Sequence, residues 1–279
     1  LCLVYHPQDL SSLECFPFDS LQELRKLEYK GVPNRLSREH VDWEIINSVS
    51  LNCKKKRTAR ISITPFDYPP MKDGPQNAFS AHDVIKARRS AVAMDGETSI
   101  TKDQLLSMLD KTLPRLDAIP FDLQLNEPMI HLVLFVHRVK KLESGVYIFV
   151  RNPNDTQLLK TRLDLDYTWE QVEKDFPLYQ LSKTDVRSVA TSISCGQDIA
   201  GDGAFSLGML ANFEKSVHVD PTLYPVLYWE TGIIGQVLYL EAETHGVRAT
   251  GIGCFFDDSM HDYIGLNDDS FQSLYHFTI

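Results

Sequence analysis

Hydrophobic residues recur with helical spacing most regularly between positions 229 and 245. Isoleucine, valine, leucine and alanine stand four residues apart there, which predicts a long helix with one broad buried face. Gly232 and Gly235 are poor helix formers, so we expect them to let another backbone approach closely. Gly246 follows where a left-handed helix end belongs. The pairs that define the face are Ile233/Val237, Ile234/Leu238 and Leu238/Ala242.

The segment after this helix, residues 247–254, alternates weakly and ends in Gly251-Ile252-Gly253. Two glycines around one apolar residue allow the backbone to lie against a flat ligand. An ordinary glycine turn between a strand and a loop fits the same spacing equally well, because short glycine motifs also occur without any ligand. The helix and this turn, within residues 224–258, are the elements on which the rest of the chain is expected to pack.

Apolar runs elsewhere predict an antiparallel block of strands. Residues 131–139 are rich in aliphatic side chains, which indicates a strand buried on both faces. A hairpin loop at 140–145 and a returning strand at 146–150 follow. Two further strands are expected at 205–213 and 273–279, whereas the segment 168–185 reads as polar and irregular.

Helix start signals occur at several points. Thr101 and Gln104 have the spacing of a capping box, and Ser80 has the position of an N-cap for a shorter helix. The remaining expected helices lie near 19–29, 37–53 and 260–264, and residues 188–201 form either a helix or a loop.

Prolines and glycines concentrate in residues 64–80, where few apolar positions are periodic. We predict a linker there, between a helical region at 1–63 and a main domain at 81–279. The chain begins at Leu1 and ends inside an apolar run, so we expect it to be part of a longer protein.

Composition excludes several classes of protein. The chain of 279 residues has a formal net charge of −10 and a pI of about 5.4, which argues against general nucleic-acid binding and against binding to an anionic membrane surface. No apolar run reaches the length of a membrane span. The five scattered cysteines, none in a CxxC spacing, indicate a reducing, cytoplasmic setting rather than a disulfide framework or a zinc site.

Arg88-Arg89-Ser90 is the first candidate for ligand chemistry. On the helix that begins after Ser80, neighbouring arginines would point about 100° apart. Together with the serine hydroxyl they offer several donors to a phosphate or a polyol chain. Two surface arginines at a helix end are the alternative.

Other polar residues are expected to be structural. No serine-hydrolase elbow, Walker loop, GxGxxG or HExxH motif occurs in the chain. His131 and His137 lie on a predicted strand without a partner at ligand spacing, and Asp257-Asp258 with His261 fits a solvated loop cap better than a metal site. Cys254, beside the glycine turn, is interpreted as a small buried thiol.

Five segments, taken in their order along the chain, resemble the FMN-dependent nitroreductase family, and in particular its branch of azoline (thiazole/oxazole) peptide dehydrogenases. The resemblance covers residues 80–279. The segments are ARRSAVAMDG (87–96), SITKDQLLSML (99–109), VHRVKKLESGVYIF (136–149), ETGIIGQVLYLEAETHGVRATGIGCFFDD (230–258) and GLNDDSFQSLYHFTI (265–279).

The resemblance implies an α+β, three-layer fold with a central, mostly antiparallel sheet flanked by helices. It also implies ping-pong electron transfer through bound FMN, from NADH or NADPH to a small-molecule or peptide substrate.

Arg88-Arg89-Ser90 matches the motif that holds the FMN phosphate, ribityl chain and ring edge. Gly251-Ile252-Gly253 matches the turn against the isoalloxazine ring, and Gln197 matches a glutamine near the flavin. The long helix matches the one that forms the dimer interface, so the implied partner is a second copy or a tandem copy. Residues 1–63 are then a helical extension or the remnant of a preceding degenerate copy.

The chain departs from the family pattern at several points. Val92 stands where a second basic residue is usual, residues 118–128 lack the expected glycine, and the Lys-Tyr catalytic pair of the peptide dehydrogenases is absent. Family members also continue to a basic residue beyond the last strand. These departures favour reduced FMN affinity and argue against azoline oxidation. The alternatives to a flavin oxidoreductase are a catalytically degenerate flavin-fold module that binds a peptide or protein, and a peptide-tailoring azoline dehydrogenase.

Overall fold

A computed structural model of the chain describes residues 18–32, 34–39, 41–55, 66, 68–69, 79–115, 119–121 and 127–279. Its contacts divide the chain into two compact units, Leu1–Glu44 and Ile45–Ile279. The predicted division into 1–63, 64–80 and 81–279 stays a prediction, because most of the expected linker lies outside the described residues.

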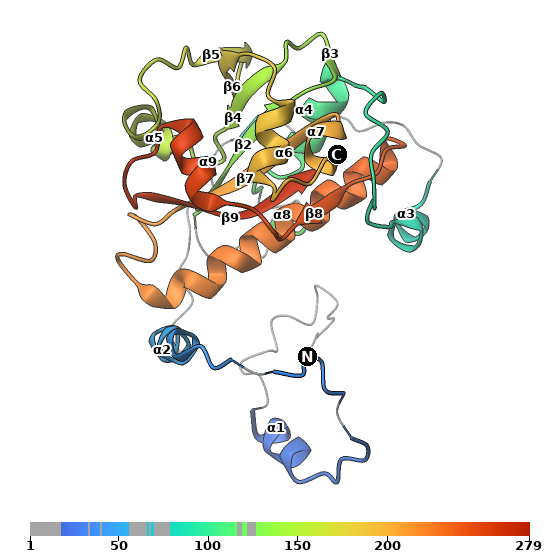
Figure 1. Cartoon of the computed structure of the whole chain (residues 1–279), viewed down its shortest axis with the longest axis vertical. Coiled ribbons are helices and arrows are strands. Elements are labelled where there is room, and N and C mark those ends of the chain that lie inside the picture. Colours follow the sequence, from blue (N-terminus) through green and yellow to red (C-terminus); the bar gives the residue numbers. More distant parts are fainter. Residues whose placement is uncertain are drawn as a thin grey trace. The chain divides into compact units, whose positions relative to one another are not determined.

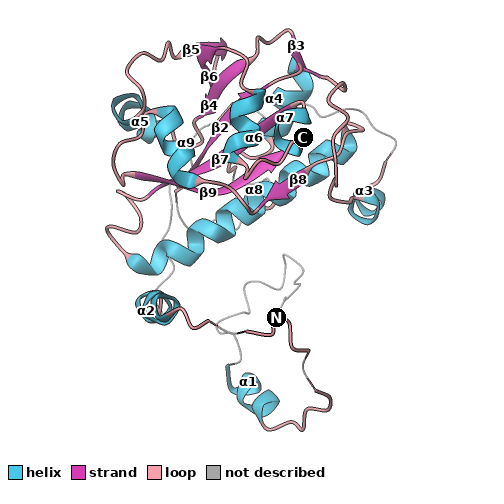
Figure 2. Cartoon of the chain, in the orientation of Figure 1, coloured by secondary structure: helices cyan, strands magenta, loops and turns pink. Residues whose placement is uncertain are grey.

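The second unit contains a seven-stranded sheet in which every neighbouring pair is antiparallel, in the order β5-β6-β4-β2-β7-β9-β8 (Figures 1 and 2). A short parallel pair, β1 with β3, lies beside it. The strands are β1 Ile100–Thr101, β2 Ile130–Val136, β3 Val139–Lys140, β4 Gly145–Phe149, β5 Glu170–Glu173, β6 Phe176–Lys183, β7 Phe205–Asn212, β8 Thr250–Ile252 and β9 Phe271–Thr278.

The helices follow the local signals of the sequence. Ser80 accepts a hydrogen bond from the Asp83 N–H at the start of α3, and both hydrogen bonds of the predicted capping box between Thr101 and Gln104 are present at the start of α4. The helices are α1 Phe18–Arg25, α2 Glu44–Asn52, α3 Ala81–Ala87, α4 Lys102–Asp110, α5 Thr156–Arg162, α6 Arg187–Ile193, α7 Ile199–Asp202, α8 Tyr224–Thr244 and α9 Asp257–Ile264. Two short 3₁₀ turns, η3 Pro153–Asp155 and η4 Pro221–Leu223, precede α5 and α8.

Helices cover both faces of the sheet, which confirms the expected three-layer α+β fold. Strands β2 and β7 are buried along their whole length, because side chains alternate between two faces and each face packs on an apolar layer. One core cluster joins the sheet to α4 and α8, and a second joins it to α5, α6 and α9.

Helix α8 crosses one face of the sheet, and its buried stripe is narrower than predicted. Ile234, Leu238 and Ala242 are buried, whereas Ile233 and Val237 are only half-buried. Among the described residues, the expected close approach of another backbone occurs at neither glycine: a Cβ on Gly235 would make an ordinary contact with the Tyr275 ring at 3.5 Å, and one on Gly232 would meet open space. Gly246 has a φ of +73°, as a left-handed helix end requires.

A buried ion pair joins α8 to the end of β4. Arg151 has no exposed surface, and its guanidinium contacts the carboxylate of Glu230 on α8. Further hydrogen bonds lower the cost of burying such a pair. Arg151 also donates to Thr112 O at 2.9 Å and Ile130 O at 3.0 Å, and Glu230 accepts from the Met129 N–H at 3.1 Å. The second terminal nitrogen of Arg151 is buried without a hydrogen-bond partner among the described residues.

Three expectations about local structure are wrong. The segment 168–185 is not irregular, because β6 pairs with both β4 and β5 and buries alternate side chains. Helix α2 begins at Glu44 rather than near Ser37. Helix α3 ends at Ala87, so Arg88 and Arg89 do not lie on a helix.

Candidate functional site

Two distant parts of the chain meet beside the C-terminal half of α8. Ser90 and Ala249 form a parallel β-bridge, and the Ala91 N–H donates to Ala249 O at 2.8 Å. The bridge places the residues after α3 next to β8 and the glycine turn, and α3 itself lies near the end of α8 (Figure 1). Segments singled out separately in the sequence therefore share one site.

Tyr239 on α8 connects these segments. Its hydroxyl accepts a hydrogen bond from the Gly251 N–H at 2.8 Å and lies 2.9 Å from the Ser90 hydroxyl. The Arg88 guanidinium carbon is 4.7 Å from the centre of the Tyr239 ring, which is cation–π geometry. Three predicted site residues thus converge on one side chain.

Tyr239 is the residue that the sequence analysis missed. Burial opposes its ionisation, but hydrogen bonds from Ser90 and Gly251, together with the charge of Arg88, hold the pKa of Tyr239 below its ordinary value. The only signal for Tyr239 in the sequence is a ring with a hydroxyl group within an apolar helical stretch. This signal alone does not predict which residues the hydroxyl contacts.

The glycine turn has two different glycines. A Cβ on Gly251 would overlap the Tyr275 hydroxyl, so this position requires glycine for packing. A Cβ on Gly253 would meet open space. Ile252, between them, is buried and anchors the turn to the sheet through pairing with His276 on β9.

Arg89 is not brought into this cluster. Its side chain is exposed and donates to Lys86 O and Arg88 O, both at 2.8 Å. Arg88, in contrast, is half-buried against Tyr239. The two arginines therefore differ in their surroundings, although no sequence pattern distinguishes them.

Gln197 lies between α6 and α7 and contacts the far end of the glycine turn. Its side-chain amide donates to Ser194 O at 2.8 Å and to Cys254 O at 3.0 Å.

Cys254 forms a disulfide with Cys195. The interpretation of Cys254 as a buried thiol is therefore wrong. The expectation, from their scattered spacing, that these cysteines do not pair is also wrong, because folding joins two cysteines that are 59 residues apart in sequence.

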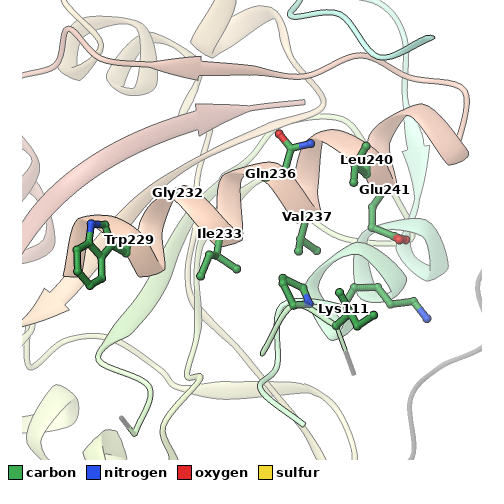
Figure 3. A pocket seen from close by; sticks show the side chains of 10 residues that line it. Lys111, Trp229, Gly232, Ile233, Gln236, Val237, Leu240 and Glu241 are labelled. Carbon is green, nitrogen blue, oxygen red and sulfur yellow. The ribbon is translucent and has the colours of Figure 1, made fainter. Parts of the chain in front are cut away.

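A groove with a volume of about 670 Å³ runs along the exposed side of α8. Figure 3 shows Trp229, Ile233 and Val237 on the side of the helix that faces Lys111. Trp229 is 66% exposed and Ile119, on the opposite wall, is 84% exposed. The walls are mainly apolar, so the described residues present a large hydrophobic surface along this helix.

The other polar candidates have structural surroundings. His131 is buried and has a partner that the sequence analysis did not find, Asp155, at 3.1 Å. Asp257 and Asp258 occupy the first turn of α9, where carboxylates favour the helix dipole. Among the described residues, no group of side chains has the arrangement of a metal site, and no described helix could cross a membrane.

Comparison of the sequence with models of protein families and with curated proteins gives no match. Solved structures do match. A protein assigned as a nitroreductase from Anabaena variabilis is 24% identical, with a TM-score of 0.54 over 70% of this chain and 36% of that one. One from Ralstonia eutropha, also assigned as a nitroreductase, is 15% identical, with a TM-score of 0.52 over 80% and 94% of the two chains.

The chain has a nitroreductase-like fold. The E. coli microcin synthetase McbBCD complex, with truncated pro-MccB17 bound, also matches at 14% identity and a TM-score of 0.50, over 98% of this chain and 85% of that one. This chain spans about a third of the Anabaena protein, 36% of its length. Identities this low establish the nitroreductase-like fold and not the reaction.

Proposed function

We propose that the chain is an FMN-dependent oxidoreductase whose cofactor site lies where Arg88, Ser90 and Gly251 converge on Tyr239. This convergence is the observation that carries the proposal, because the fold alone does not name a reaction. A cation, a hydroxyl and an approachable backbone turn are the groups that a phosphate, a polyol chain and a flat ring would each require.

The residues present fit FMN. Arg88 supplies positive charge for the phosphate, whereas Arg89 would have to leave its bonds to Lys86 O and Arg88 O to add its own charge. Ser90 offers a hydroxyl to the ribityl chain, and the Gly251-Ile252-Gly253 turn presents a backbone shelf with open space at Gly253. Gln197 lies at the Cys254 end of that shelf. When bound, FMN would supply two-electron transfer between NADH or NADPH and an organic acceptor.

The partner that best fits the α8 groove is a second copy of the same fold. The groove is lined by apolar side chains and continues into exposed Trp229, and a self-complementary helix face is the usual basis of a two-fold dimer. The greater length of the Anabaena protein is compatible with a tandem copy as an alternative source of that second surface.

Titration with FMN tests the cofactor proposal. We expect the purified chain to retain flavin absorbance after removal of free FMN, and to bleach anaerobically with NADH or NADPH. A chain that stays colourless in excess FMN would contradict the proposal. Because the α8 groove is expected to be covered by a second copy, the same sample is also measured for its mass in solution.

A second candidate function is a binding module without turnover. The side chain of Val92, where the family usually has a basic residue, is 97% exposed and supplies no charge to the site. The peptide bound in the McbBCD complex suggests a peptide as the ligand of such a module. FMN binding without bleaching by either nicotinamide would favour this candidate, and oxidation of an azoline peptide would favour a peptide-tailoring dehydrogenase.

A further inference from the structure

The disulfide between Cys195 and Cys254 lies at the edge of the candidate site rather than in the core. Cys195 follows α6, and Cys254 directly follows Gly253. Cys254 is exposed and Cys195 is half-buried, so Cys254 is the more accessible residue of the pair. Exposed disulfides are the ones that tend to be labile, regulatory or catalytic.

Noncovalent contacts hold the two cysteine segments together independently of the sulfur–sulfur bond. The Phe256 N–H donates to Ile193 O at 2.8 Å, and the Gln197 side chain donates to Cys254 O at 3.0 Å. The Cα atoms of the two cysteines are 5.9 Å apart, within the usual range for a disulfide. Reduction therefore leaves both thiols within reach of each other, which favours re-formation of the bond.

The backbone around Cys195 is also unusual. Its φ is +56°, a left-handed conformation that few residues other than glycine adopt, and Gly196 follows with a φ of +71°. The disulfide to Cys254 therefore starts from a left-handed turn of the backbone. Such conformations persist where surrounding structure holds them, and they concentrate at functional sites.

We propose that Cys195 and Cys254 form a reversible redox pair that exchanges with a dithiol reductant. A thiolate of the reductant attacks the sulfur of Cys254, the more exposed residue, the Cys195–Cys254 bond breaks, and Cys195 leaves as a thiolate that takes up a proton from solvent. The second thiol of the reductant loses its proton to solvent and attacks the reductant's first sulfur in the mixed disulfide. Cys254 is released as a thiolate, which is also protonated by solvent. Two electrons and two protons pass to the protein, and the reductant becomes a disulfide.

The redox state of this pair acts directly on the end of the glycine turn. Cys254 is covalently joined to the α6–α7 junction only in the oxidised form, whereas in the reduced form the Gln197 and Phe256 hydrogen bonds hold the turn alone. The exchange itself requires only the two sulfurs and an external dithiol. It therefore stands or falls independently of the FMN proposal.

The test uses the folded chain without denaturant. Separate samples are treated with a thioredoxin-type protein and its reducing system, or with dithiothreitol, then quenched with acid and alkylated. Peptide mass spectrometry follows Cys195 and Cys254, with Cys53, a free cysteine, as the internal reference. We expect both thiols to appear together while circular dichroism stays unchanged, and the disulfide to re-form with oxidised glutathione. The faster of the two reductants identifies a protein or a small molecule as the source of the dithiol.

Reduction that occurs only in denaturant, or thiols that fail to pair again in the folded chain, would overturn the proposal in favour of a purely structural bond.

A separate experiment tests which sulfur is attacked first. A thioredoxin-type reductant that lacks its second thiol traps the mixed disulfide. The adduct is expected on Cys254, and an adduct on Cys195 would overturn the proposed step. Two matched variants each leave one of these thiols free: Cys195→Ser leaves Cys254, and Cys254→Ser leaves Cys195. The Cys254 thiol should react with an aromatic disulfide reagent about tenfold faster than the Cys195 thiol.

Discussion

The Tyr239 hydroxyl accepts a hydrogen bond from the backbone N–H of Gly251 at 2.8 Å, so one side chain of α8 fixes the position of the glycine turn. The same hydroxyl contacts Ser90. A helix that packs on the sheet thereby controls two segments that approach the candidate site from different parts of the chain.

Removal of this hydroxyl should weaken cofactor binding without unfolding the chain. In Tyr239→Phe, the Gly251 N–H and the Ser90 hydroxyl lose their shared partner while the ring remains beneath Arg88. We expect the dissociation constant for FMN to rise about tenfold, the equivalent of one net hydrogen bond, in a fluorescence titration. Tyr224→Phe, at the other end of α8, is the matched control and should leave binding unchanged. Equal affinities for all three chains would contradict the role assigned to Tyr239.

The two glycines of the turn should respond differently to a methyl group. In Gly251→Ala the Cβ overlaps the Tyr275 hydroxyl, whereas in Gly253→Ala it enters open space. We expect Gly251→Ala to lower the free energy of unfolding by about 1–3 kcal/mol and Gly253→Ala to change it by less than about 0.5 kcal/mol. Urea denaturation of the two variants measures both values. A destabilised Gly253→Ala, or an unaffected Gly251→Ala, would be inconsistent with this packing.

Loss of charge at Glu230 should be among the most destabilising single changes. Glu230→Gln keeps the shape of the side chain but leaves the Arg151 guanidinium buried without an opposite charge. We expect the free energy of unfolding to fall by about 3–5 kcal/mol, measured by chemical denaturation. The surface pair of Lys183 with Glu143, at 56% and 66% exposure, supplies the control, since Glu143→Gln should cost at most about 1 kcal/mol. Similar costs for the two variants would show that the buried pair contributes little.

His276 should make stability depend on pH. Burial lowers the pKa of His276 from its ordinary value of 6.5 to about 4 in the folded chain, so between these values the unfolded chain binds the extra proton. The contribution of neutral His276 to the free energy of unfolding is complete above pH 6.5. It is lost as the pH falls toward 4, and the free energy of unfolding falls by about 3 kcal/mol over the whole window. His137, whose pKa burial also lowers to about 4, acts in the same window.

Unfolding curves at several pH values measure this dependence. Wild type should lose stability more steeply between pH 6.5 and 4 than His276→Asn, which retains the contributions of the other histidines whose pKa burial lowers, His137, His245 and His261. Parallel slopes for the two chains would mean that His276 is not held neutral in the folded state.

Local patterns predicted much of the fold, and contacts between distant residues account for most of what they missed. The aliphatic run of β2 and the capping box of α4 carry their structure within a few residues, so they were predicted correctly. Strand β6 was missed because Tyr179 and Gln180 make it look polar, and its place in the sheet depends on pairing with β4. The glycine turn and Arg88 were singled out by residue type and spacing, and the resemblance implied their flavin role, but Tyr239 and the Cys195–Cys254 bond depend on tertiary packing that spacing does not reveal.

FMN binding by wild type and by Arg88→Ala measures whether Arg88 belongs to the proposed cofactor site. The structure sets Arg88 against Tyr239, so we expect wild type to bind FMN and the variant to bind at least tenfold more weakly, because a charge-assisted contact contributes roughly 1.5–3 kcal/mol. Arg187→Ala, which removes a surface arginine paired with Asp185, controls for net charge and should bind like wild type. Equal FMN affinity for Arg88→Ala and wild type, or no binding by wild type at saturating FMN, would contradict the account.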